Sequence, residues 1–260
     1  RKAAYQAANT GADDGQLGML RRLEFPPAIF RRLKSEAEDL GLVFLSTPFE
    51  GASAQVLADL GVVGFKLGSG EATNLPFLAQ IAGYGRPMLL STGMCDLDEV
   101  MTAVAVIRAH GDPPLGLLHC VSTYPAPADQ SNLRAMESLR LACGGPVGMS
   151  DHSLGWEVAL AAVALGARVI EKHLTTDRRL PGPDHAASIE HDELAEMMRQ
   201  LRRVESALGD GVKRPMSCEM DTRTVARKSL VAARDLPAGG TLTATDLAVK
   251  RPGTCLLYTS

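Results

Sequence analysis

Residues 146–155 read PVGMSDHSLG, and residues 167–177 read ARVIEKHLTTD. Each stretch begins as a short apolar run and ends in polar or ionisable side chains. Four earlier runs have the same form: LVFLSTPF at 42–49, VVGFKLGSGE at 62–71, PMLLSTGM at 87–94 and LGLLHCVSTYP at 115–125. Their length and their flanking Gly and Pro residues predict six buried strands.

Segments with the period of a helix lie between and after these runs. They are expected at residues 28–40, 97–109, 156–165 and 192–208. Asp96 precedes the second of them, and Glu99 follows three residues later, which is the pattern of a capping box. Strand and helix alternate at intervals of roughly 20–30 residues, as in the βα units of a parallel sheet.

A doubly wound sheet and a (β/α)8 barrel both satisfy this alternation. Polar side chains at the end of nearly every run favour the barrel, because a barrel gathers the carboxyl ends of its strands around one mouth. No G-x-G-x-x-G follows a first strand, so a dinucleotide site has no support. We therefore predict an α/β fold, a (β/α)8 TIM barrel that lacks about its first two strands.

The composition changes after residue 208. Residues 209–226 are polar and irregular and are predicted to be a linker. Residues 227–260 contain short β-prone pieces around the turn LPAGG and are predicted to begin a small β-rich domain. The final CLLYTS, at 255–260, continues no pattern and is interpreted as foreign sequence. The barrel domain is accordingly assigned to residues 1–208.

Composition limits the possible partners and compartment. A net charge of −3 gives no reason to expect nucleic acid or an anionic membrane, and no apolar run is long enough to span a bilayer. Five cysteines without a C-x-x-C pair favour reduced thiols, and hence a cytoplasmic protein. His119 and Cys120 are neighbours on a strand, so they point to opposite faces and do not form a nucleophilic pair.

Side-chain alternation also bears on the two histidine-containing runs. Ser150 shares a face with His152, and Glu171 shares a face with His173. If both strands end at one barrel mouth, the two imidazoles can bind one divalent metal, with Glu171 as a further ligand or as a residue that orients His173 or a water. The alternative is that each histidine bonds locally at the end of its strand.

Lys66 lies inside an apolar run and needs an anionic partner. Gly68, Ser69 and Gly70 can bring backbone N–H groups to an anion, and hydroxyls at neighbouring strand ends add donors. This set suits a phosphate, although such hydroxyls often only satisfy the backbone. In the loop at 178–188, Asp184 is either an acceptor of substrate hydroxyls or a turn-forming residue.

Taken together, seven motifs resemble the sialic acid synthase family, which includes neuraminate, legionaminate and pseudaminate synthases. They are FLSTPF, FKLGSGEATNLPFL, PMLLSTGM, LLHCVSTYPAP, GMSDHSLG, EKHLTTDRRLPGPDHAAS and ARKSLVAARDLPAG with KRPG. The resemblance runs in order from about residue 3 to 253. It implies a TIM barrel followed by a small antifreeze-like (SAF) domain, and a domain-swapped homodimer in the full-length protein.

The resemblance implies condensation of phosphoenolpyruvate with an N-acetylated hexose to give a nonulosonic acid and phosphate. The implied acceptor is N-acetylmannosamine or a 2,4-diacetamido-6-deoxy analogue, and the implied cofactor is Mn or Mg. A pseudaminate synthase or another phosphoenolpyruvate-using barrel synthase is the alternative. A lyase-type aldolase and a non-enzymatic sugar-binding protein are the other classes.

The family motifs assign roles by position. Phosphoenolpyruvate binding falls to Thr47, Lys66, Ser69, Ser91, Ser122 and Ser150. Ser122 stands where some members have Asn. His152 and His173 are the implied metal ligands. Tyr124 and Asp184 fall near the acceptor sugar, and Glu71, Lys66 and Glu171 are the candidate catalytic residues.

Some family motifs have no counterpart in this sequence. Members begin with a strand that carries a glutamate and an Asn-His-Asn-Gly-like loop, followed by a strand with a lysine and a glutamine. The SAF-domain arginine that reaches the partner's site is expected beyond residue 260. We therefore expect the complete enzyme to be active and the 260-residue chain alone to be inactive.

Overall fold

The computed structural model describes residues 2–10 and 15–253, and CLLYTS lies outside them. The chain divides into two compact units, unit 1 at residues 1–208 and unit 2 at residues 209–260. Among the described residues, no helix is both long and apolar enough to cross a membrane.

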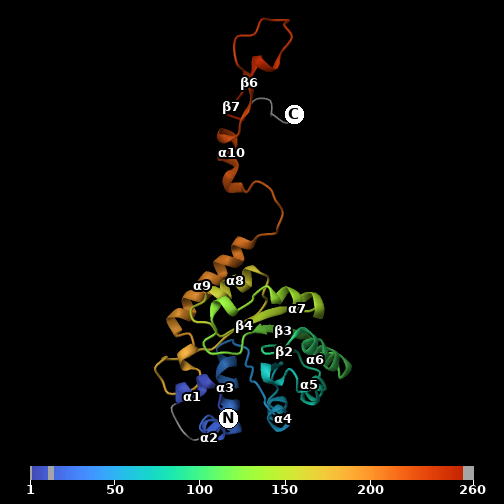
Figure 1. Cartoon of the computed structure of the whole chain (residues 1–260), viewed down its shortest axis with the longest axis vertical. Coiled ribbons are helices and arrows are strands. Elements are labelled where there is room, and N and C mark those ends of the chain that lie inside the picture. The colour runs from blue at the N-terminus through green and yellow to red at the C-terminus, as the bar shows by residue number, and fades with distance from the viewer. Residues whose placement is uncertain (1, 11–14, 254–260) are drawn as a thin grey trace. The chain divides into compact units, whose positions relative to one another are not determined.

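Unit 1 is built on a five-stranded parallel sheet in the order β1-β2-β3-β4-β5 (Figure 1). Its strands are β1 Phe65–Leu67, β2 Met88–Ser91, β3 Leu115–Cys120, β4 Val147–Asp151 and β5 Ile170–Lys172. Each strand pairs with the next one in the sequence, so the sheet is one continuous wall of a (β/α) barrel. This confirms the predicted fold class and five of the six expected strands.

The first expected strand, 42–49, is not part of the sheet. Residues 42–48 carry no regular secondary structure and form no ladder with β1. Phe44 packs against the core, but Leu42 and Val43 are 61% and 69% exposed. An apolar run becomes a strand only where a neighbouring strand shares its backbone hydrogen bonds, and in the described part of the chain this run forms no such ladder.

The expected helices are confirmed at 28–40, 97–109, 156–165 and 192–208. In chain order, the helices of unit 1 are α1 Ala4–Thr10, α2 Gly15–Arg21, α3 Pro27–Asp39, α4 Gly51–Asp59, α5 Leu75–Ala82, α6 Leu97–Ala109, α7 Ala135–Cys143, α8 Glu157–Ala164 and α9 His191–Leu208. The capping box predicted for α6 is present, since the Asp96 carboxylate accepts from the Glu99 N–H at 2.9 Å and Glu99 accepts from the Asp96 N–H at 3.0 Å.

The two faces of the sheet have different environments. Alternate side chains such as Phe65, Leu90 and Met149 are buried in one core with residues of α4, α5, α6, α7 and α8. Figure 1 shows these helices around the sheet. A second, smaller core joins α8 to α9 through Ala159 and Leu201. The intervening side chains point to the opposite, inner face, which therefore receives the polar residues of the strands.

Unit 2 contains helix α10, Met220–Ala226, and an antiparallel pair, β6 Ser229–Ala232 with β7 Leu247–Lys250. The buried carboxylate of Asp246 stabilises the connection between these strands. It accepts from Arg234 Nε at 2.7 Å and from the Thr243 hydroxyl at 2.7 Å. The strand pair lies within the segment that was predicted to begin a β-rich domain.

Candidate active site

The predicted site residues that the strands carry lie on the inner face of the sheet, at the carboxyl ends of β1 to β5. Lys66, Ser91, Ser150 and Glu171 are inward members of four different strands. His152 and His173 come directly after β4 and β5. Register pairs Ser150 with Glu171 across these two strands, so the sequence alternation places both histidines at one edge.

A chain of polar contacts joins four of these side chains across the face. Lys66 Nζ donates to Ser91 Oγ at 2.9 Å and lies 3.3 Å from Glu171 Oε2. Ser150 Oγ donates to Glu171 Oε1 at 3.3 Å. Lys66 also donates to the Leu67 carbonyl at 2.7 Å, and its side chain is 11% exposed. The result is a nearly buried ammonium group beside hydroxyls and one carboxylate.

The two predicted metal ligands face each other. The ring centroids of His152 and His173 lie 5.2 Å apart and the rings are nearly perpendicular, at 78°. His152 is 5% exposed, and its Nδ1 hydrogen bonds to the Val121 carbonyl at 2.9 Å. A carbonyl can only accept, so Nδ1 donates in this bond, while Nε2 lies 3.5 Å from Ser150 Oγ. Burial lowers the pKa of His173 below its usual value, and this effect outweighs the opposing effect of the Asp184 carboxylate.

A tyrosine stacks over this histidine pair. The Tyr124 ring lies 4.1 Å from the His152 ring and 5.4 Å from the His173 ring, by centroids. On its other side, Tyr124 contacts Tyr5 of α1 at 4.8 Å. Burial, together with the neighbouring Cys120, Tyr5 and carboxylate groups, raises the pKa of Tyr124 well above its usual value, so this phenol stays neutral.

Asp184 lies at the edge of the same cluster. Its Oδ2 is 3.8 Å from His173 Nδ1, while its buried Oδ1 has no hydrogen-bond partner in the structure. A buried carboxylate oxygen without a donor is costly, which marks a position where a ligand donor or cation fits. The loop that carries Asp184 is tied to α1 by Asn9, whose amide donates to the Pro183 carbonyl at 2.7 Å.

Ser69 and Ser122 belong to a neighbouring group around Gly93. The Gly93 N–H donates to Ser69 Oγ at 2.9 Å. A Cβ placed on Gly93 would lie 2.3 Å from Ser122 Oγ, 2.9 Å from Ser69 Oγ and 3.1 Å from Cys120 Sγ. The absence of a side chain at Gly93 therefore keeps this part of the inner face open to the two hydroxyls.

Two predicted residues are not joined to the others by any contact among the described residues. Thr47 follows the irregular segment 42–46 and is half-buried. Glu71 accepts a hydrogen bond from Asn74 at 2.8 Å, at the start of α5. The roles predicted for Thr47 and Glu71 thus gain no geometric support and stay predictions.

Cys120 is a site residue that the sequence reasoning missed. As expected, it does not meet His119, whose Nε2 bonds to the Ser131 carbonyl at 2.8 Å. Its Sγ instead lies 3.7 Å from His152 Nδ1 and 3.8 Å from Ser122 Oγ. The available signal was side-chain alternation, which places Cys120 on the same face as Ser122.

Cys120 and His152 shift each other's pKa in opposite directions. Burial alone would raise the pKa of the Cys120 thiol, but hydrogen bonds and the charge of His152 lower it overall. Burial alone would lower the pKa of His152, but the contacts with Cys120, the Val121 carbonyl and Glu171 raise it overall. Both shifts run against the effect of burial, and the contact of Cys120 Sγ with His152 Nδ1 at 3.7 Å contributes to each of them.

The two imidazoles, His152 and His173, fit two ligand positions of an open metal site. A ligating histidine usually donates its other ring N–H to a carbonyl or carboxylate, as His152 does to Val121. Within residues 2–10 and 15–253, no three His, Cys, Asp or Glu side chains are grouped closely enough to enclose a metal. His152 and His173, with the unpaired Asp184 oxygen nearby, therefore suit a cation that keeps several positions for other ligands.

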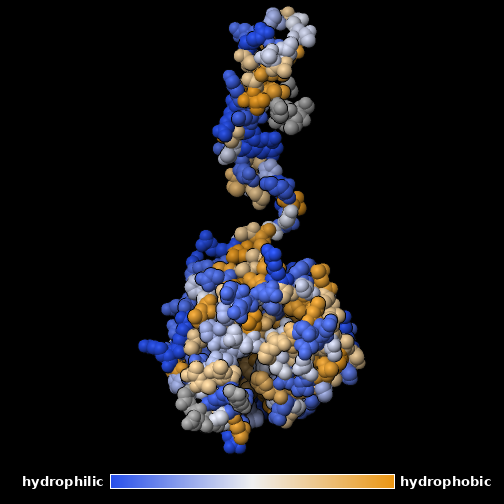
Figure 2. Space-filling view, in the orientation of Figure 1, coloured by the Kyte–Doolittle hydropathy of each residue, from blue (hydrophilic) through white to orange (hydrophobic). Residues whose placement is uncertain are grey.

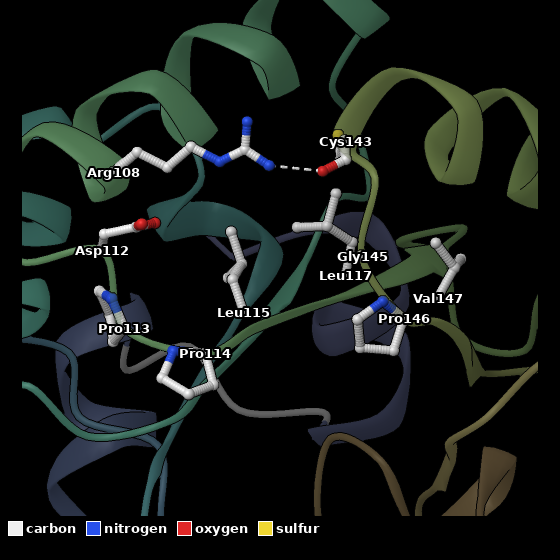
Figure 3. A pocket seen from close by; sticks show the side chains of 10 residues that line it. All are labelled: Arg108, Asp112, Pro113, Pro114, Leu115, Leu117, Cys143, Gly145, Pro146 and Val147. Carbon is white, nitrogen blue, oxygen red and sulfur yellow. Dashed lines mark hydrogen bonds between the residues drawn. The ribbon is translucent and has the colours of Figure 1, made fainter.

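A cavity of about 290 Å³ lies at the opposite ends of the strands, near the starts of β3 and β4 (Figure 3). Three prolines, at 113, 114 and 146, contribute to its wall. Arg108 crosses its rim and donates to the Cys143 carbonyl at 2.6 Å, which ties α6 to the end of α7. None of the predicted site residues lines this cavity, so it is separate from the histidine cluster.

Comparisons with known proteins agree with this architecture. The model of the NeuB family matches residues 1–213, and the SAF domain model matches residues 227–260. The N,N'-diacetyllegionaminic acid synthase of Campylobacter jejuni is 43% identical over 97% of this chain and 76% of that protein. The synthase of the same name from Legionella pneumophila is 42% identical over 97% of this chain and 72% of that protein.

A solved structure is similar over most of the chain. The N-acetylneuraminic acid (sialic acid) synthetase of Leptospira borgpetersenii, determined in complex with citrate, superposes with a TM-score of 0.76. It is 34% identical, and the match covers 84% of this chain and 76% of that one.

Proposed function

The chain belongs to the NeuB family, and from this premise we propose that it condenses phosphoenolpyruvate with an N-acetylated hexose to give a nonulosonic acid and phosphate. The observation that supports this most is the contact chain from Lys66 through Glu171 to Ser150, directly beside the two facing imidazoles. In this arrangement the Lys66 ammonium group and the serine hydroxyls, which suit a phosphate, lie next to the histidine pair, the candidate site for a carbonyl oxygen.

The proposed bond changes are those of an aldol-type condensation. C3 of phosphoenolpyruvate forms a bond to the aldehyde carbon of the open-chain sugar, and water adds at C2. The tetrahedral carbon then loses phosphate by cleavage of its C–O bond, which leaves a 2-keto acid. His152 and His173 would hold the divalent metal, which when bound would supply Lewis-acid polarisation of a carbonyl oxygen at this edge.

The side chains of this chain have distinct tasks in that reaction. Lys66 and Ser91 hold the phosphate, and their fixed hydrogen bond means that little reorganisation is needed as charge develops. Glu171 lies between Lys66 and Ser150, where it can accept a proton from the water that adds at C2. The unpaired Asp184 oxygen accepts a hydroxyl of the sugar.

The acceptor is best proposed as a 2,4-diacetamido-6-deoxy hexose. Two relatives at 43% and 42% identity carry names that specify a diacetylated product. N-acetylmannosamine is the second candidate, since the similar structure from Leptospira is a sialic acid synthetase.

The test of this function is phosphate release by the complete enzyme with phosphoenolpyruvate, Mn²⁺ and each sugar in turn. We expect release that depends on the sugar, and a kcat/KM that is higher for the diacetamido sugar. Higher kcat/KM for N-acetylmannosamine would reverse the order of the two acceptors. Phosphate release that is unaffected by either sugar would contradict the condensation itself.

Replacement of Gly93 by alanine tests the place of the phosphate. The new methyl group would meet Ser122 Oγ and Ser69 Oγ, so it would occupy space that we assign to phosphoenolpyruvate. We expect KM for phosphoenolpyruvate to rise about tenfold or more, because two donors are displaced. KM for the sugar should change little.

Gly83→Ala is the matched control, since Gly83 follows the last residue of α5, away from the predicted site residues, and a Cβ there would meet only the backbone oxygens of Gln80 and Ala79, at 3.3 and 3.6 Å. An unchanged KM for phosphoenolpyruvate in a folded Gly93→Ala variant would exclude this corner of the inner face from the binding site.

A further inference from the structure

We propose that Asp151 and Lys172 form a positioning clamp that fixes the separation of His152 and His173. The inference rests on the proposed function in so far as those histidines hold a metal. Each member of the pair directly precedes one of the histidines in the sequence. The clamp therefore acts at the backbone positions from which both imidazoles project.

Register and side-chain direction support this assignment. Asp151 and Lys172 are directly paired across β4 and β5. They point to the helix-covered face of the sheet, opposite to Ser150 and Glu171. One face of this strand pair thus carries the ion pair, and the other face carries the candidate chemistry.

The contacts of the pair fix both neighbours of His152. Lys172 Nζ donates to Asp151 Oδ2 at 2.8 Å and to the Ser153 carbonyl at 2.8 Å. Asp151 Oδ1 accepts from the Ser153 N–H at 2.9 Å and from its hydroxyl at 2.6 Å. His152 lies between two residues that are each tied to the same lysine, so its backbone has little freedom to move away from β5.

Burial distinguishes this pair from the other ion pairs of the described chain. The side chains of Lys172 and Asp151 are 4% and 0% exposed, whereas those of Arg140 and Glu137 are 56% and 55% exposed. Removing two charges from water costs about as much as their attraction returns, so stability is a weak reason to bury an ion pair. Here the pair instead fixes the relative position of the two strand ends, because its hydrogen bonds allow only one arrangement of them.

The experiment uses the 260-residue chain with three variants. Lys172→Met leaves the buried Asp151 carboxylate without its cation. The double variant Asp151→Asn with Lys172→Met removes both charges, keeps the acceptor for Ser153 and keeps the apolar stem. Arg140→Met breaks an exposed pair and serves as the control. Mn²⁺ affinity is measured by the electron paramagnetic resonance signal of free Mn²⁺, and Tm is measured without metal.

We expect Lys172→Met to lower Tm and the double variant to regain most of that loss. In both, we expect Mn²⁺ to bind roughly 10- to 100-fold more weakly, as is usual when a residue that orients a ligand is removed. Arg140→Met should bind Mn²⁺ as the parent chain does. A double variant with regained Tm and the parent's Mn²⁺ affinity would overturn the clamp.

A metal-free readout separates this inference from the proposed function. Diethyl pyrocarbonate modifies neutral imidazoles, and peptide mass spectrometry gives its rate at each histidine at pH 8. His152 is buried and should react several-fold faster in the double variant, while exposed His110 should not change. If the parent chain binds no Mn²⁺, the metal-binding role of the histidines is contradicted, and the rate of His152 modification still tests the clamp. A rate that is the same in the double variant and in the parent chain would overturn it.

Discussion

The complete enzyme with Lys66→Met is expected to release phosphate with a kcat/KM lower by roughly 10²- to 10³-fold, the loss seen when one fixed donor to a developing anion is removed. Methionine keeps the stem that packs beside β2 but cannot donate to Ser91 or neutralise a phosphate. It also leaves Glu171 without the ammonium group that lies 3.3 Å from its carboxylate. The measurement is steady-state phosphate release at saturating sugar.

Lys34→Met is the matched control, because Lys34 is also paired with a glutamate, Glu38, at 2.6 Å. That pair joins successive turns of α3 and includes none of the predicted site residues, so activity should be unchanged. A Lys66→Met enzyme that is as active as the Lys34→Met enzyme would remove Lys66 from the phosphate site.

The same residue separates a synthase from a lyase-type aldolase. An aldolase lysine forms a Schiff base with its carbonyl substrate, which borohydride reduces to a stable adduct. Lys66 Nζ donates to a carbonyl and to a hydroxyl and lies 3.3 Å from the Glu171 carboxylate, so these contacts occupy the nitrogen that would have to attack a carbonyl. We expect no borohydride-trapped adduct at Lys66, and an adduct found there by mass spectrometry would favour the aldolase.

The sequence predicted most of the sheet, and the reason is its alternation. Most helix-facing residues, such as Phe65, Leu90 and Met149, are apolar, and the inner residues Lys66, Ser91 and Ser150 are polar, so the pattern indicates both the position and the orientation of a strand. The run at 42–49 has the same composition but is not a strand. Hydropathy reports that a segment can be buried, and it does not report whether a hydrogen-bonding neighbour is present.

For the site, the sequence predicted which side chains share a face and missed contacts between distant segments. Ser150 and His152, and Glu171 and His173, follow from strand period alone. Strand alternation separates Cys120 from His119, but it does not show that the partner of Cys120 across the strands is Ser150. Tyr5 contacts Tyr124, which is distant in the sequence, and no local sequence pattern predicts this contact. Cross-strand register and long-range stacking depend on the whole fold.

His152→Ala is expected to abolish Mn²⁺ binding by the complete enzyme and to lower phosphate release by about 10³-fold or more. The structure gives the reason, because His152 faces His173, and its Nε2 is the ring nitrogen that the bond to Val121 does not use. With one imidazole gone, too few protein ligands remain to hold a divalent cation in place. Metal content and turnover are measured on the same preparation.

His119→Ala is the control that separates metal loss from damage to the sheet. His119 lies on the neighbouring strand, points to the other face and bonds to the Ser131 carbonyl at 2.8 Å. Both variants remove a partly or fully buried imidazole and leave a carbonyl without its donor, so both should lower Tm. Only His152→Ala should lose Mn²⁺, because only His152 faces His173. Full activity of His152→Ala with metal still bound would contradict the assignment of the histidine pair, and equal loss of activity in both variants would attribute the effect to the sheet.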